Sequence, residues 1–165
     1  MQQMDVEQSI AAATGVRPVG DGEATGPSIL VIGAAGAIGR RLVAALAARD
    51  PGCVVCGLRR TALEEPLASR VACEFGVDVR DDKTVRGVLR KFRGSLTTVW
   101  NLAAPLSVDT AKDADAARDV TVGGMERLLR AMREEAPGCT RMLFSDSLGS
   151  GQEKGDSTSL QLGCS

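Results

Sequence analysis

The chain has 165 residues, which is enough for one domain with a hydrophobic core. Hydrophobic residues make up 44% and charged residues 25%, proportions that are ordinary for a soluble globular protein. The net charge of −1 gives no reason to expect nucleic acid or an anionic membrane surface as a partner. No apolar run approaches the roughly 20 residues that a membrane-spanning helix needs, so we expect no membrane protein.

The cysteines and the absence of histidine limit the chemistry further. The chain has five cysteines and no histidine, and Cys53 and Cys56 form a CxxC pair, a spacing found in redox and zinc sites. We favour buried, reduced thiols, because Val54 and Val55 have the pattern of a buried strand and no second CxxC exists. The sequence therefore predicts no metal site and a cytoplasmic protein.

Three segments differ in composition along the chain. Residues 1–26 mix acids, glycines and small residues without periodicity, and we expect a flexible arm. Asp5 and Glu7 argue against an import presequence, which avoids acids. Residues 27–150 carry regular patterns and form the predicted domain. Residues 151–165 are polar and rich in glycine and serine, so we expect a disordered tail.

Strand and helix patterns alternate through the predicted domain. In chain order, the predicted elements are the strand Ile29–Ile32, the helix Ile38–Arg49, the strands Cys53–Leu58 and Val71–Phe75, the helix Asp82–Phe92, the strand Thr98–Ala103, the helix Asp113–Glu135 and the strand Arg141–Ser145. This alternation predicts the α/β class, with a parallel sheet of about five strands and helices on both faces.

A glycine-rich turn joins the first predicted strand to the first predicted helix. Gly33 allows a sharp turn out of the strand, Gly36 leaves room for a pyrophosphate, and Gly39 allows the helix and strand to pack closely. The free N–H groups at the helix start, including those of Ala37 and Ile38, would point at the phosphates. A structural turn alone is the weaker interpretation, because the strand–turn–helix context of a dinucleotide site is present.

The GxxGxxG spacing resembles the extended short-chain dehydrogenase/reductases, the NAD-dependent epimerase/dehydratase family. Asp78 and Val79 match the family's acid and backbone amide against the adenine. The segment NLAA, which ends in Leu102, Ala103 and Ala104, resembles the family's fourth-strand (H/N)xAA motif beside the ribose and nicotinamide. The resemblance implies that all five residues contact the cofactor.

The resemblance covers about residues 29–150. From residue 100 to 147 the sequence is similar to the L-threonine dehydrogenase and UDP-galactose epimerase subgroups. The family implies a Rossmann-like sheet with strand order 3-2-1-4-5, here incomplete.

The end of the second predicted strand bears on the choice between NAD and NADP. NAD-binding relatives place an acid there to hold the ribose 2′-hydroxyl, whereas this sequence has Leu58 followed by Arg59 and Arg60. An arginine fork suits a 2′-phosphate, which an acid would repel. A solvated basic loop is the alternative. The pattern favours NADP over NAD.

The resemblance also exposes missing catalytic residues. Extended short-chain enzymes use a Ser or Thr after strand five and a Tyr-x-x-x-Lys on the next helix. Ser147 matches the serine, with Ser145 as the alternative, but the chain contains no tyrosine and Lys154 is the only later lysine. Thr121 replaces the usual asparagine of the long helix. We expect a chain truncated before the tyrosine helix and inactive by itself.

Two functional interpretations remain open. One is the NAD(P)-binding part of an epimerase/dehydratase-type oxidoreductase, and the other is a catalytically dead module that binds a dinucleotide or a protein. Amino acids such as threonine and nucleotide sugars both stay open as substrates. In the family the long helix pairs with a second subunit, so a homo-oligomer through Asp113–Glu135 or through the edge of strand five is expected.

Overall fold

The computed structural model describes residues 28–105 and 113–145, so the predicted arm 1–26 and the predicted tail 151–165 lie outside the described residues. Five parallel strands form one sheet in the order β3-β2-β1-β4-β5. The strands are β1 (Ser28–Ile32), β2 (Val54–Leu58), β3 (Ala72–Phe75), β4 (Leu96–Asn101) and β5 (Arg141–Phe144). The predicted fold class and strand order are therefore confirmed.

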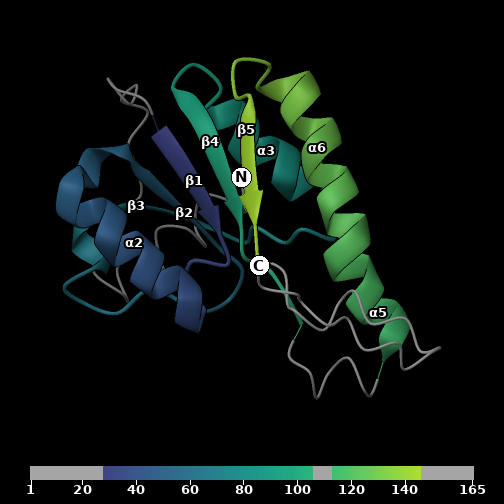
Figure 1. Cartoon of the computed structure of the whole chain (residues 1–165), viewed down its shortest axis with the longest axis horizontal. Coiled ribbons are helices and arrows are strands. Elements are labelled where there is room, and N and C mark those ends of the chain that lie inside the picture. The colour runs from purple at the N-terminus through teal and green to yellow at the C-terminus, as the bar shows by residue number, and fades with distance from the viewer. Residues whose placement is uncertain (1–27, 106–112, 146–165) are drawn as a thin grey trace, which may run out of the picture.

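Helices cover both faces of the sheet (Figure 1). On one face, α2 (Ala37–Arg49) buries Val43 and Ala47 against those residues of β1 and β2 whose side chains point toward this helix. On the other face lie α3 (Asp82–Lys91) and α6 (Gly124–Glu135), whose buried residues share a core with Leu30 and Val99 of the central strands. This double cover explains why β2 is buried along its whole length and reads as an unbroken apolar run.

Short helical turns complete the described chain. Pro51–Cys53 (η1) and Ala68–Arg70 (η2) are single 3₁₀ turns, and Cys53 therefore belongs to η1 and not to β2 as predicted. Asp50 caps η1, since its side chain accepts a hydrogen bond of 3.1 Å from the amide of Gly52. An acid followed by Pro-Gly is a common turn signal, which the apolar pattern after it obscured.

The fourth strand begins and ends two residues earlier than predicted. The apolar run through Ala103 predicted a strand to that residue, but β4 ends at Asn101. The Asn101 side chain accepts a hydrogen bond of 3.2 Å from the Ala103 amide, and the Leu102 amide donates one of 3.0 Å to the Ile32 carbonyl. These bonds turn the chain out of the sheet beside the end of β1.

The predicted long helix is present and contains a π-helical turn. It runs as α5 (Ala114–Arg118), the π turn η3 (Asp119–Gly123) and α6, after the N-cap Asp113, whose carboxylate accepts from the Ala116 amide. Gly124 explains the close approach of this helix to the rest of the domain. A Cβ atom there would lie 2.9 Å from Cγ2 of Val79, so a larger residue would push the helix away.

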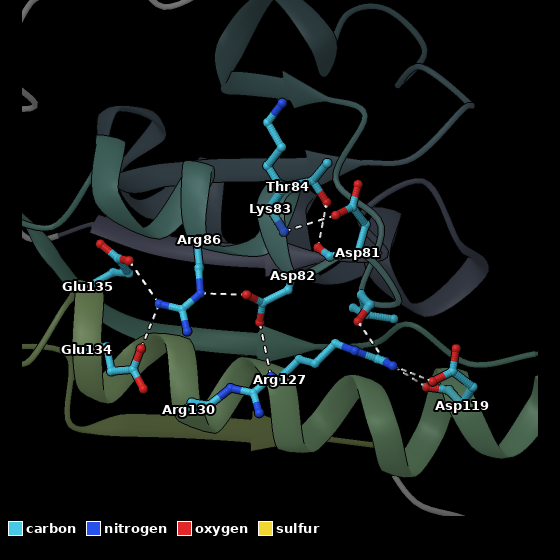
Figure 2. Close-up of polar contacts among 11 residues, drawn as sticks. Asp81, Asp82, Lys83, Thr84, Arg86, Asp119, Arg127, Arg130, Glu134 and Glu135 are labelled. Atoms are coloured by element: carbon cyan, nitrogen blue, oxygen red, sulfur yellow. Dashed lines mark hydrogen bonds and ion pairs between the residues drawn. The ribbon is translucent and has the colours of Figure 1, made fainter.

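Ion pairs fasten α6 to α3 on the outer side of that layer (Figure 2). Arg86 of α3 contacts Asp82 on its own helix at 2.6 Å, and Glu134 and Glu135 of α6 at 2.7 and 3.0 Å. Arg130 of α6 reaches back to Asp82 at 3.2 Å. Single surface pairs contribute little, but a network that shares its partners fixes the relative position of the two helices.

Glu135 is the acid of this network whose protonation is most perturbed. Hydrogen bonds from Arg90 and Arg86 lower its pKa from 4.5 to about 2. Because the folded-state pKa lies below the unfolded value, the carboxylate stabilises the fold above about pH 4.5. That contribution is lost as the pH falls toward 2.

We therefore expect Glu135→Gln to lower the melting temperature at pH 7, and the difference from the wild type to shrink between pH 4.5 and 2. Glu126→Gln on the same helix is the control, because Glu126 makes no ion pair with any residue in 28–105 or 113–145. Thermal unfolding followed by circular dichroism at several pH values measures both. A difference that stays constant over this pH range would contradict the assignment.

Three large apolar side chains remain exposed beside the long helix and the edge strand. Val122 is 48% exposed, Leu129 51% and Phe144 57%. Met132 of the same helix is buried and packs into the core shared with α3. Among the described strands, β5 has a neighbour on one side only. An exposed apolar helix face and a free strand edge both favour association.

We expect the purified chain to self-associate through the long helix, with Leu129 in the contact. Leu129→Glu should shift the protein toward the monomer without loss of thermal stability, because the side chain is half exposed. Arg133→Gln, an exposed change on the same helix, is the control. Size-exclusion chromatography with light scattering gives the masses, and a wild-type chain that is already monomeric would refute this.

Candidate functional site

The turn between β1 and α2 depends on close backbone contacts. Gly33 has φ +79°, a conformation that favours glycine, and a Cβ there would lie 2.8 Å from the carbonyl carbon of Leu102. A Cβ at Gly39 would overlap the Gly33 carbonyl oxygen and lie 2.8 Å from the Cα of Ala34. The predicted close packing of helix and strand at Gly39 is therefore present.

The first turn of α2 is open to an anion. Gly36 is the N-cap residue, and no side chain caps the helix or places an acid in its first turn. The Gly36 amide donates to the Gly33 carbonyl at 3.0 Å, which closes the glycine turn beneath the helix. The amides at the helix start thus have no acidic competitor within the helix, and the helix dipole favours negative charge there.

A cavity of about 550 Å³ opens at the carboxyl ends of β1, β2 and β4, in front of this turn. Nine of the predicted cofactor residues line it. They are Gly33, Gly36, Arg59, Arg60, Asp78, Val79, Leu102, Ala103 and Ala104. In open α/β sheets, ligands bind at this end of the strands, where the strand order reverses.

The other predicted residues lie elsewhere. Ala37, Ile38 and Gly39 do not line the cavity. Ile38 is 62% exposed on α2, and Gly39 is buried against the turn, so at the helix start only the N-cap residue Gly36 lines the cavity. Ser147 lies outside the described residues. Ser145 follows β5 and lines a second cavity of about 380 Å³ together with Asn101 and other residues.

The end of β2 places Leu58 and the two arginines after it in different surroundings. Its side chain is 1% exposed and packs in the α2-side core, and it does not line the cavity. The next residue, Arg59, is the first after β2 to line the cavity, followed by Arg60. Strand alternation explains the difference, because successive side chains point to opposite sides. The residue type that lines the cavity at this point is therefore arginine.

Sequence reasoning missed one charged residue of the cavity on the β3–α3 side. Arg80 lines it and hydrogen-bonds both oxygens of Asp78, at 3.1 and 2.8 Å. Arg59 makes an ion pair with the same carboxylate at 2.8 Å. The Arg80 hydrogen bond first, and then Arg59, lower the pKa of Asp78 to about 2. Asp78 is therefore ionised at any pH where the protein would be assayed.

The wall formed by Asp78 and Val79 is held from the far side by α6. Arg127 contacts the Val79 carbonyl oxygen at 3.5 Å and the Asp119 carboxylate at 2.6 Å (Figure 2). Gly124 lies directly against the Val79 side chain. Asp113, Ala116, Ala117 and Val120 of the same long helix complete the cavity wall. Such contacts between distant segments leave no periodic signal in the sequence.

Two other predicted features can be placed. Thr121 uses its hydroxyl within the helix, where it donates to the Ala117 carbonyl at 3.0 Å. Of the CxxC pair, Cys56 is buried, whereas Cys53 is half-buried, so the prediction of two buried thiols is correct for Cys56 only. The cysteines in the described part of the chain form no disulfide. In the same residues, no cluster of three or more His, Cys, Asp or Glu side chains could hold a metal ion.

Comparison with known families accounts for this geometry. Residues 29–162 match the NAD dependent epimerase/dehydratase family. The chain belongs to that family. The resemblance inferred from the glycine turn is thereby confirmed, and the cavity lies in the NAD(P)-binding domain of an epimerase/dehydratase-type protein.

Solved structures give the same result. The UDP-glucose 4-epimerase of Thermus thermophilus, in complex with NAD, is 32% identical with a TM-score of 0.55, over 66% of this chain and 34% of that one. A monomeric L-threonine 3-dehydrogenase from a metagenome, in its apo form, is 30% identical with a TM-score of 0.54, over 65% and 33%. The GalE-like L-threonine dehydrogenase of Cupriavidus necator is 26% identical with a TM-score of 0.59, over 70% and 36%.

The matched region is about a third of each solved structure. No curated protein matches the sequence. Within residues 28–105 and 113–145, no helix is both long and apolar enough to cross a membrane. Family membership establishes the class of cofactor as a nicotinamide dinucleotide.

Proposed function

We propose that the chain binds NADP(H) in the 550 Å³ cavity, with the pyrophosphate at the first turn of α2. The observation that carries this proposal is the open helix start in front of the cavity. Gly33 and Gly39 bring the backbone close enough for the amides to face a ligand, and Gly36 adds no side chain between them. Asp78 and Val79 would then meet the adenine.

The charges of the cavity support a choice of NADP over NAD. Three arginines and two aspartates line it, and one of the aspartates, Asp78, is already paired. Arg60 has no ion-pair partner among the described residues. No acid stands at the end of β2 or in the next three residues to accept hydrogen bonds from a ribose 2′-hydroxyl. Arg59 and Arg60 offer planar donor groups that match a phosphate.

Catalysis by the 165-residue chain itself is not part of the proposal. Enzymes of this family transfer a proton through a tyrosine, and the sequence contains none. We propose that the chain supplies cofactor binding, and that threonine-like amino acids and nucleotide sugars remain the candidate substrate classes of an intact relative. A dinucleotide-binding module without activity of its own fits the same residues.

We expect the wild-type chain to bind NADPH more tightly than NADH. Arg59→Gln should weaken NADPH binding about tenfold, which is the lower end of the effect of losing a hydrogen bond to a charged group. NADH binding should change little. The lower end applies because Arg59 must leave Asp78 to reach the phosphate. Titration of each cofactor, followed by its own fluorescence, gives the two Kd values. Arg49→Gln, at the opposite end of α2, is the matched control. Equal Kd values for both cofactors in the wild type would refute the arginine assignment.

We also expect the chain to show no turnover of L-threonine or UDP-glucose with either cofactor. Loss of a positioned acid–base group costs roughly 10²–10⁴ in rate, and substrate orientation is lost besides. Cofactor absorbance and product analysis measure this, with an intact threonine dehydrogenase as the positive control. Turnover that disappears in a Ser147→Ala variant would show that another residue replaces the tyrosine.

A further inference from the structure

The Asp78 carboxylate lies between two arginines that hold it unequally. Arg80 donates to it three times, from its backbone amide at 3.0 Å and from its guanidinium at 3.1 and 2.8 Å. Arg59 reaches it from the end of β2 through one ion pair, between Nε and Oδ2 at 2.8 Å. Asp78 therefore keeps most of its contacts when Arg59 leaves.

Arg59 is the partner that holds Asp78 by fewer contacts. Its side chain is 44% exposed at the cavity, and Asp78 is its one ion-pair partner among the described residues. A phosphate that enters the cavity would compete with Asp78 for the same guanidinium, because both are anions that prefer arginine. A ribose hydroxyl would not compete, since it carries no charge.

We propose that Asp78 is an internal competitor for the 2′-phosphate, and that Arg80 is a specificity-determining residue that holds Asp78 when Arg59 turns to the phosphate. The proposal rests on the proposed binding of NADP(H). In this arrangement Arg80 acts through Asp78. Without Arg80, the Asp78 carboxylate would stay paired with Arg59, and the affinity for NADPH would fall toward that for NADH. Without the Asp78 charge, Arg59 would be free and the advantage would grow.

The ratio of the Kd for NADH to the Kd for NADPH isolates this effect, because the adenine, ribose and pyrophosphate contacts common to both cofactors cancel. Arg80→Gln should lower the ratio about threefold, and Asp78→Asn should raise it by a similar factor, the size expected for a partly exposed charge pair. Low ionic strength limits screening of the pair. Arg80→Lys keeps the positive charge and should restore much of the ratio. Circular dichroism and thermal unfolding verify that each variant is folded.

The double variant decides between two roles for Arg80, because Arg80 also lines the cavity. If Arg80 acts through Asp78, adding Arg80→Gln to Asp78→Asn leaves the ratio at the Asp78→Asn value. If Arg80 touched the phosphate directly, it would lower the ratio in both backgrounds, which would overturn the proposal. An Arg80→Gln variant that weakens both cofactors equally would overturn it too, since that is the effect of a structural role.

Failure of the proposed function gives a different result from failure of this inference. A wild-type chain without preference for NADPH refutes the proposed function. A preference for NADPH that depends on Arg59 but not on Arg80 or Asp78 refutes only the roles inferred for Asp78 and Arg80. Should Arg80→Gln fail to fold, the Asp78→Asn variant alone decides, because an unchanged ratio there contradicts an internal competitor.

Discussion

The contact of backbone with backbone at the end of β1 is the constraint on which the rest of the site depends. Gly33 lies against the Leu102 carbonyl group, and Gly39 lies against Gly33 itself, so that no room for a Cβ exists at either position. This contact fixes the direction of α2 and places its uncapped start at the cavity. Beside this contact, the hydrogen bonds at Asn101 and Leu102 turn the chain out of the sheet, and Ala103 then lines the cavity.

The second wall is set from a distance, by the helix layer on the other face of the sheet. Ion pairs between α3 and α6 position α6, and α6 then meets the β3–α3 loop through Gly124 and Arg127. That loop carries Asp78 and Arg80, and the Asp78 carboxylate pairs both with Arg80 and with Arg59 at the end of β2. The electrostatic character of the cavity therefore depends on three separate segments that the fold brings together.

The sequence predicted those parts of the fold that depend on local patterns. Apolar runs, helical spacing and the glycine turn indicated all five strands, and the family resemblance implied their order. The errors have physical causes. The end of β4 depends on the Asn101 side chain, and the ion pair between Arg59 and Asp78 joins two separate segments of the sequence. Periodicity carries no information on such contacts.

Hydrogen–deuterium exchange with and without saturating NADPH tests most directly whether the open start of α2 is the phosphate site. Amides that bind the pyrophosphate should exchange more slowly, so we expect protection at Gly36–Arg40, together with Arg59 and Arg60. Residues of α6 on the exposed side around Leu129 should be unaffected and serve as the internal reference. Binding of NADPH with no protection at Gly36–Arg40 would contradict the account.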